Sequence, residues 1–163
     1  MIFAAVAVAS CMAAGTARAS SSDEAAIRAL EAQFTKAFNA KDIDAIMKLY
    51  VQDDSLVVFD VVPPREYIGP KAYRKDWEGL LGMFKGPIKF ELSDLHVFAG
   101  GTTGYGYSIQ HVSGTDTKGQ PIDLTVRVTD GYRKVNGRWL IAHEHVSVPV
   151  DLETGKPDWT SKP

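Results

Sequence analysis

The chain has 163 residues, of which 45% are hydrophobic and 23% are charged, a composition typical of a globular protein with one hydrophobic core. Its formal net charge is −2 and it has no run of basic residues, which argues against binding to nucleic acid. The single cysteine, Cys11, lies near the N-terminus, so the sequence predicts neither a disulfide nor a thiolate metal site in the folded domain.

The first nineteen residues have the layout of a secretory signal peptide. They contain an apolar stretch without acidic residues, and residues 17–19 (Ala-Arg-Ala) form a small-residue pattern typical of a cleavage site. We therefore expect an exported protein, periplasmic or secreted, that is cleaved after Ala19. Residues 8–11 (Val-Ala-Ser-Cys) support the alternative of a lipoprotein anchored through Cys11. The apolar stretch is too short to span a bilayer.

Three helices are expected in the first half of the chain. A capping-box pattern at Ser21 and Glu24 predicts the start of the first helix. Asp42 is a suitable N-cap for a short second helix. Pro70 predicts the start of a third helix, because proline is favoured in a first helical turn.

The second half of the chain is expected to form strands. A first strand is predicted at 55–61, and after Pro87 the apolar periodicity changes to two, which predicts strands at 88–98, 103–113, 124–135 and 138–148. Asn136 and Gly137 favour a tight hairpin turn between the last two. Helices followed by antiparallel strands predict one α+β domain, residues 21–155, with three N-terminal helices on a curved, mostly antiparallel sheet. Residues 156–163 are expected to be a polar tail.

The last predicted strand suggests a functional site. Regular alternation places His143, His145 and Ser147 on one face of this strand and Glu144 on the other. With the hairpin at residues 136–137 setting the register, Asp130 of the preceding strand falls on the same face as the histidines. Imidazoles, a hydroxyl and a carboxylate on the concave face of a curved sheet predict a polar-lined cavity.

Four more residues are expected around this cavity. Tyr107 and His111 alternate along the strand at 103–113 and are predicted to join it, while Asp60, at the end of the first strand, is predicted to close one rim. Trp77 of the third helix is a candidate lid. Each of these residues also has a purely structural interpretation, as a loop cap, an ion-pair partner or part of the core.

Histidines two residues apart on a strand, such as His143 and His145, can also ligate zinc, with Asp130 or His111 as a third ligand. This spacing is a weak pattern. The alternative is a hydrogen-bonded network in which these histidines satisfy neighbouring buried polar groups. We therefore expect no metal and no other cofactor.

Four segments carry a family resemblance: AFNAKDIDAIMKLY, DDSLVVFD, GPKAYRKDW and VTDGYRKVNGRWLIAHEHVSVPVD. Together they resemble the SnoaL-like, ketosteroid-isomerase-like branch of the nuclear transport factor 2 superfamily, over nearly all of residues 22–155. The ending GRWLIAHEHVS also resembles the association domain of calmodulin-dependent kinases. The resemblance implies a cystatin-like cone of helices and bent sheet around a deep pocket, and often a homodimer formed through the sheet.

The resemblance also implies roles for individual residues. Asp60 matches the carboxylate that acts as the base in ketosteroid isomerases, and Asp130 matches the protonated acid of their oxyanion hole. Phe34, however, lies where those enzymes have a tyrosine, and a phenyl ring cannot donate the hydrogen bond that an enolate needs. The resemblance therefore does not predict true steroid isomerisation.

Three functions follow as hypotheses. The first is an exported protein that binds a small organic molecule in the pocket, with Trp77, Tyr107, His111, His145 and Ser147 as contacts. The second is an acid–base enzyme, isomerase- or hydrolase-like, in which Asp60 moves a proton and Asp130 or His143 stabilises the developing charge. The third is an oligomerisation scaffold. The fold alone does not choose among them.

Overall fold

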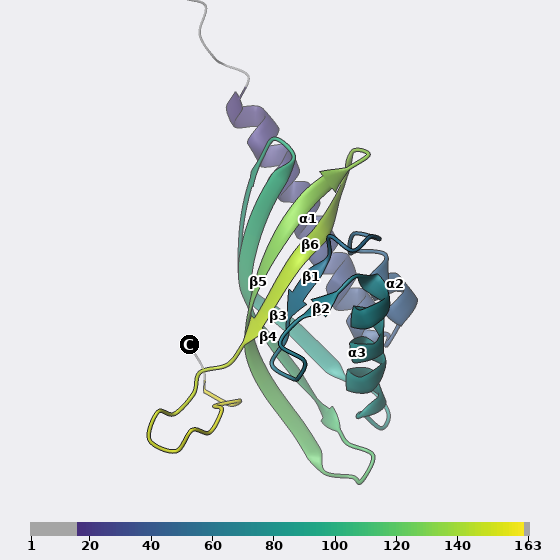
Figure 1. The fold of residues 1–163 in the computed structure, drawn as a ribbon, viewed down its shortest axis with the longest axis vertical. Coiled ribbons are helices and arrows are strands. Elements are labelled where there is room, and N and C mark those ends of the chain that lie inside the picture. Colours follow the sequence, from purple (N-terminus) through teal and green to yellow (C-terminus); the bar gives the residue numbers. More distant parts are fainter. Residues whose placement is uncertain (1–15, 162–163) are drawn as a thin grey trace, which may run out of the picture.

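The computed structural model describes residues 16–161 and has an α+β architecture (Figure 1). Helices α1 (Thr16–Asn39), α2 (Ile43–Met47) and α3 (Pro70–Gly82) pack on one face of a six-stranded sheet. The strands lie in the order β2 (Tyr67–Ile68), β1 (Val57–Phe59), β6 (Arg138–Ser147), β5 (Pro121–Val135), β4 (Thr103–Thr115) and β3 (Lys89–Gly100). Neighbours are antiparallel, except that β1 runs parallel to β6. The predicted fold class is confirmed.

The N-terminal region differs from the prediction at one point. Helix α1 begins at Thr16, upstream of the capping box at Ser21 that was expected to start it. Residues 1–15, including Cys11, lie outside the described residues, so the signal peptide, its cleavage and the lipid anchor all stay predictions. Among the described residues, no helix is long and apolar enough to cross a membrane.

The predicted elements of the sheet are present, with one addition. The strand β2 was not predicted, because it is only two residues long and follows a proline-rich loop, yet it pairs with β1 through Val57 and Ile68. The expected turn between β5 and β6 is confirmed. Both Asn136 and Gly137 have positive φ values, of 50° and 79°, as a tight hairpin of the predicted kind requires.

A β-bulge in β6 changes which side chains face the helices. Gly131 of β5 pairs with His143, whereas the next residue, Tyr132, pairs with Ile141, so Ala142 is an extra residue in β6. Such a bulge reverses the alternation of side chains beyond it. As a result Glu144 points into the domain and is only 4% exposed, and the two histidines point to the opposite face. The prediction that His143 and His145 face inward and Glu144 outward is therefore wrong.

The inner face of β4 carries small residues, because α1 and its neighbours lie close to it. A Cβ atom on Gly104 would lie 3.1 Å from Ile27 Cδ1, and one on Gly106 would lie 3.1 Å from the Tyr132 hydroxyl. The larger side chains of this strand, among them Tyr105 and Tyr107, therefore occupy the outer face and are exposed.

Candidate functional site

A cavity of about 540 Å³ lies between α1, α3 and the inner face of the sheet. Most of its wall is apolar, and the aromatic part is a cluster of edge-to-face rings, with Trp77 at 5.6 Å from Phe34 and 5.4 Å from Phe38. Aliphatic side chains of β4, β5 and β6, namely Val112, Leu124, Val126 and Val146, form the floor. The low polarity of this wall strengthens any polar interaction made inside the cavity.

The polar part of the wall contains a pair of carboxyls. Asp60 follows β1 and Asp76 lies on α3, and the two side chains are neighbours in the cavity wall. The Tyr67 hydroxyl donates to Asp76 at 2.8 Å, and the Val61 N–H donates to Asp60 at 2.5 Å. Burial, together with the nearby charge of Asp76, raises the pKa of Asp60 to about 6. Burial also raises the pKa of Asp76.

A third carboxyl in the wall, Glu144, is held between two tyrosines. The Tyr50 hydroxyl donates to its Oε2 atom at 2.7 Å, and the Tyr73 hydroxyl donates to its Oε1 atom. Burial raises the pKa of Glu144 to about 7, although the two tyrosine hydrogen bonds favour the ionised form. This arrangement fixes the carboxyl in one orientation at the cavity wall.

Two more buried acids, Asp130 and Glu31, lie near Glu144. Asp130 lies directly opposite Glu144 in the β5–β6 register, its Oδ1 atom is buried without a hydrogen-bond partner, and the Tyr132 hydroxyl donates to Glu31 at 2.8 Å. Asp130 is 3% exposed, and burial followed by the charges of Glu144 and Glu31 raises its pKa well above the usual range. Asp130 is therefore the neutral acid of the two, and Glu144 is the acceptor of the tyrosine hydrogen bonds.

The buried acids have no cationic partner. Among the described residues, the ion pairs that involve lysine or arginine all lie elsewhere on the domain, and none includes Asp60, Asp76, Glu144, Asp130 or Glu31. A buried carboxyl without a counter-ion is costly in its ionised form. The cavity therefore presents hydrogen-bonding acids to whatever occupies it, and it carries negative charge once they ionise.

Two of the predicted site residues line the cavity, and a third lies just behind it. Asp60 and Trp77 are part of the wall, whereas Asp130 is buried beside Glu144 on the neighbouring strand and is not part of the wall. Trp77 is not the predicted lid, since it is buried in the aromatic cluster and also packs on Tyr73 at 5.7 Å. The role of Asp130 implied by the family resemblance would have to be exerted through Glu144.

His143 and His145 lie on the outer face of the sheet. The Nδ1 atom of His143 donates to the Val57 carbonyl at 2.7 Å, and both rings pack edge-to-face against Phe59, at 5.0 and 5.7 Å. The hydrogen bond ties β6 to β1 at the point where these strands pair. These contacts make His143 a structural residue of the sheet, away from the cavity.

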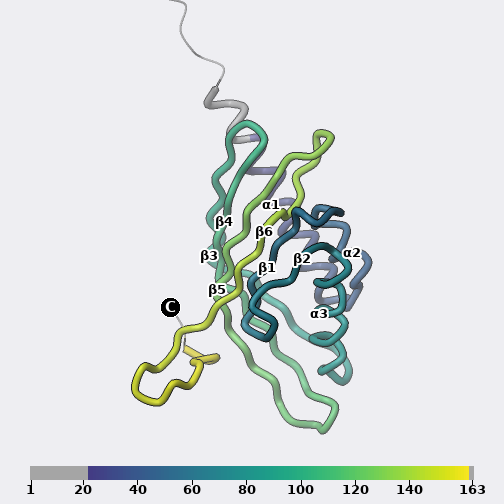
Figure 2. The backbone as a smooth tube through the Cα atoms, viewed as in Figure 1, coloured from purple at the N-terminus to yellow at the C-terminus, as the bar shows by residue number. Residues whose placement is uncertain are grey.

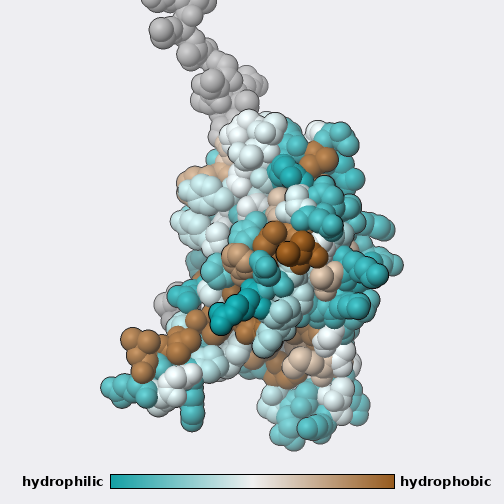
Figure 3. Space-filling view, in the orientation of Figure 1, coloured by the Kyte–Doolittle hydropathy of each residue, from teal (hydrophilic) through white to brown (hydrophobic). Residues whose placement is uncertain are grey.

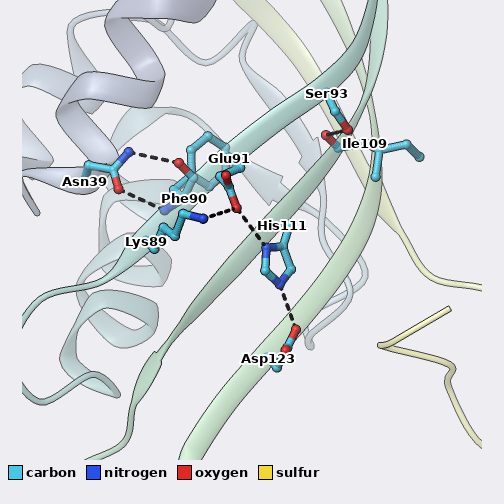
Figure 4. A network of polar contacts seen from close by, with 8 residues as sticks. All are labelled: Asn39, Lys89, Phe90, Glu91, Ser93, Ile109, His111 and Asp123. Carbon is cyan, nitrogen blue, oxygen red and sulfur yellow. Dashed lines mark hydrogen bonds and ion pairs between the residues drawn. The ribbon is translucent and has the colours of Figure 1, made fainter. Parts of the chain in front are cut away.

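Tyr107, His111 and Ser147 also lie outside the cavity, contrary to the prediction. The Tyr107 ring stacks on His96 at 4.9 Å on the outer face. Figure 4 shows His111 between Glu91 and Asp123, with its Nε2 atom 2.7 Å from the Asp123 carboxylate. Ser147 ends β6 and does not line the cavity wall.

The possible zinc ligands are separated by the sheet. Asp130 points to the inner face, whereas the histidines point outward. In residues 16–161, no group of three or more His, Cys, Asp or Glu side chains is arranged to hold a metal ion.

The sequence reasoning missed the residues that form the acidic part of the wall. Glu144 was assigned to the outer face because regular alternation was assumed, although Gly131, a glycine inside a regular strand, was an available signal of the bulge. Asp76 lies next to Trp77 on α3 and was not singled out. Tyr73 is a buried residue of α3, and its hydroxyl gives it a polar role that apolar periodicity does not reveal.

Comparison with known proteins defines the family. Residues 27–151 match the model of the SnoaL-like domain. The chain belongs to the SnoaL-like domain family, within the NTF2-like superfamily. It is similar to an NTF2-like protein of unknown function from Pseudomonas putida KT2440, with 35% identity and a TM-score of 0.79 over 88% of this chain and 99% of that one.

More distant structures share the fold of this SnoaL-like domain. A ketosteroid isomerase-like protein from Erwinia carotovora atroseptica is 20% identical, with a TM-score of 0.65, over 77% of this chain and 95% of that one. A putative calcium/calmodulin dependent protein kinase II association domain from Xanthomonas campestris is 21% identical, with a TM-score of 0.64, over 74% and 84%. No functionally curated protein gives a significant match.

Proposed function

We propose that this SnoaL-like domain binds a small, mainly apolar organic molecule in the cavity, with a polar group of that molecule against Asp60 and Asp76. The observation that carries the proposal is the composition of the wall: aromatic and aliphatic side chains enclose a cavity of about 540 Å³, and its carboxyls are grouped together. Small-molecule sites are typically cavities of roughly 300–1,000 Å³ with such a wall and a few converging polar groups.

The charge of the cavity wall limits the class of molecule that can bind in the cavity. Three carboxyls line the cavity, and Lys75 is the one lysine or arginine in its wall, an exposed residue of α3. A carboxylate or phosphate ligand would be repelled as these acids ionise. A neutral molecule with a hydrogen-bonding group, or an organic cation, meets no such repulsion.

The test uses N-phenyl-1-naphthylamine, a neutral apolar dye whose fluorescence rises when it leaves water. Val126→Phe should fill part of the cavity and weaken dye binding at least tenfold. Thr129→Phe adds the same ring to the outer face of the same strand and should leave binding unchanged. Equal binding by the wild type and Val126→Phe would contradict the proposal. Native mass spectrometry of the purified wild type should also show a retained molecule that Val126→Phe lacks.

A second candidate function is acid–base catalysis with Asp60 as the general base. The observation that favours it is the neighbouring pair of Asp60 and Asp76 in an apolar wall, where burial and the charge of Asp76 raise the pKa of Asp60 to about 6. A base with a pKa near the working pH is partly ionised and still able to hold a proton. Phe34 lies in the cavity wall, so the wall lacks the tyrosine donor of ketosteroid isomerases at that position.

Proton abstraction can be tested without knowing the substrate. Aryl-substituted ketones incubated with the protein in D₂O should exchange their α-hydrogens faster than in buffer, as followed by NMR. Asp60→Asn should lower the enzymatic part of this rate at least a hundredfold. Asp44→Asn, which changes an exposed carboxylate of α2, is the matched control. Exchange that is equal in the wild type and Asp60→Asn would rule out Asp60 as the base.

We also propose that the domain forms a homodimer through the outer face of the sheet, as the family resemblance implies. This face carries stacked, exposed aromatic rings, with Phe98 at 4.8 Å from Tyr105 and 6.3 Å from Tyr107. Figure 3 shows further apolar surface over β1 and β2, where Phe59 and Ile68 are exposed. Exposed aromatic groupings of this kind are typical of protein–protein interfaces.

A further inference from the structure

The chain continues beyond β6 into a segment that returns to the cavity. Figure 2 shows this C-terminal tail (residues 149–161) leaving β6, looping away from the body of the domain and turning back. Residues 152–161 lie beyond the stretch that matches the family, which ends at 151. They are therefore a feature of this chain that the family match does not describe.

The C-terminal tail is held together by its own hydrogen bonds. Val150 pairs with Pro157, the Asp151 N–H donates to the Lys156 carbonyl at 2.9 Å, and the Asp158 N–H donates to the Pro149 carbonyl at 2.9 Å. The carboxylate of Asp151 caps the turn at the tip, accepting from the N–H groups of residues 153 and 154. Asp158 does the same for residues 160 and 161. The tail is therefore a small preformed unit.

The C-terminal tail makes fewer hydrogen bonds to the sheet than within itself. Within residues 16–161, one hydrogen bond joins the tail to the sheet, from the Thr125 N–H to the Trp159 carbonyl, at 2.7 Å. Thr125 is available because the pairing of β5 with β6 ends at Arg127 and Ser147, which leaves the first part of β5 without a partner on that side. The tail can thus leave the sheet by breaking this backbone bond and withdrawing the Trp159 side chain from the cavity wall, while its internal bonds stay intact.

The same bond places an aromatic side chain on the cavity. Trp159 lines the cavity together with Leu124 and Val126, the neighbours of Thr125 on β5. An indole ring at this position closes part of the cavity wall with a large apolar surface. The other residues of the tail do not line the cavity, and Leu152 at its tip is 96% exposed.

We propose that the C-terminal tail is the lid of the cavity and that Trp159 contacts the bound molecule and limits its size. This inference rests on the proposed function, because a lid matters only if the cavity holds a ligand. Opening and closing of such a lid would control how fast a molecule enters and leaves. The part of the wall formed by α3 and the sheet would instead determine which polar group is recognised.

The experiment measures the dissociation rate of N-phenyl-1-naphthylamine by stopped-flow fluorescence. Trp159→Ala should raise this rate at least tenfold and should improve the affinity for the bulkier neutral dye Nile red relative to that for N-phenyl-1-naphthylamine. Trp159→Phe should restore most of the slow dissociation. Leu152→Ala, on the same tail but away from the cavity, should match the wild type. Circular dichroism and the melting temperature confirm that each variant is folded.

The outcomes separate this inference from the proposed function. If the wild type binds the dye, Val126→Phe does not, and Trp159→Ala changes neither the dissociation rate nor the dye preference, the cavity is a binding site without this lid. That result would overturn the inference about Trp159 and leave the proposed function standing. If the wild type does not bind the dye, both proposals are contradicted.

Discussion

Asp130 and Glu144 lie opposite one another on β5 and β6, both buried, and Glu144 accepts hydrogen bonds from two tyrosines. The pair has no cationic neighbour among the described residues, so one proton must be shared within it. Burial and the charge of Glu144 both oppose the ionisation of Asp130 and raise its pKa, whereas the two tyrosine hydroxyls favour the ionised form of Glu144. Glu144 is thus positioned at the cavity wall by two hydroxyls, with a neutral acid beside it on the neighbouring strand.

This assignment predicts unequal effects of two substitutions at residue 130. Asp130→Asn keeps the shape and the neutral charge of a protonated acid, so the free energy of unfolding at pH 7 should change by less than about 1 kcal/mol. Asp130→Ala removes the carboxyl and leaves a small cavity, and it should cost about 2–3 kcal/mol. Urea denaturation measures both. Equal losses for the two variants would mean that Asp130 is ionised in the folded protein.

The stability of the domain should fall as the pH rises from about 4 to about 7. Burial raises the pKa of Asp60 from its usual 3.8 to about 6, and those of Glu31 and Glu144 to about 7. Between the usual and the raised values the folded state binds more protons than the unfolded state, so each added unit of pH favours unfolding. Carboxylates with lowered pKa, such as Asp44, act in the opposite direction but mainly below pH 4.

Asp60→Asn isolates one contribution to this pH dependence. A rise in pKa from 3.8 to about 6 corresponds to about 3 kcal/mol in total, of which the wild type should lose about 2 kcal/mol between pH 4.5 and pH 7.5, a loss that Asp60→Asn should not show. Urea denaturation at pH 4.5 and pH 7.5 measures the difference, with Asp54→Asn as the control at an exposed carboxylate. A variant whose loss of stability between these pH values equals that of the wild type would show that Asp60 titrates normally.

The close approach of the β3 backbone to Gly104 of β4 predicts contrasting effects at two glycines. A Cβ atom on Gly104 would lie 2.8 Å from the Phe98 carbonyl oxygen, which is backbone and cannot move aside easily. Gly104→Ala should therefore destabilise the domain by about 1–3 kcal/mol. Gly82, at the end of α3, has no atom within 4 Å of the corresponding position, so Gly82→Ala should be neutral or slightly stabilising. Thermal unfolding distinguishes them, and a neutral Gly104→Ala would contradict the packing described.

Part of this structure could be predicted from the sequence alone. The helices, the long strands and the hairpin at Asn136 follow from local patterns, and the structure confirms them. The residues of the site could not be predicted in the same way. The face of the sheet on which a strand residue lies depends on unbroken alternation along the strand before it. One extra residue, Ala142, moves Glu144 into the domain and the histidines out. Asp60 was found because its position at a strand end does not depend on that alternation.

The exposed aromatic rings of the outer face predict a dimer that substitutions there should weaken. Tyr107 is 42% exposed and stacks on His96, with Phe98 and Tyr105 beside it. Burying such rings against a second copy supplies apolar area at little cost in side-chain freedom. Phe98→Ser combined with Tyr105→Ser should raise the dimer dissociation constant at least a hundredfold, as measured by light scattering over a concentration series.

The matched control for this dimer lies on the same molecule but away from the sheet. Met83 is about as exposed as the aromatic residues, yet it lies just after α3, so Met83→Ser should leave the association unchanged. Binding of N-phenyl-1-naphthylamine should survive the double substitution, because the cavity opens on the other face of the sheet. A wild-type protein that stays monomeric at all concentrations would overturn the proposed dimer and leave the cavity unaffected.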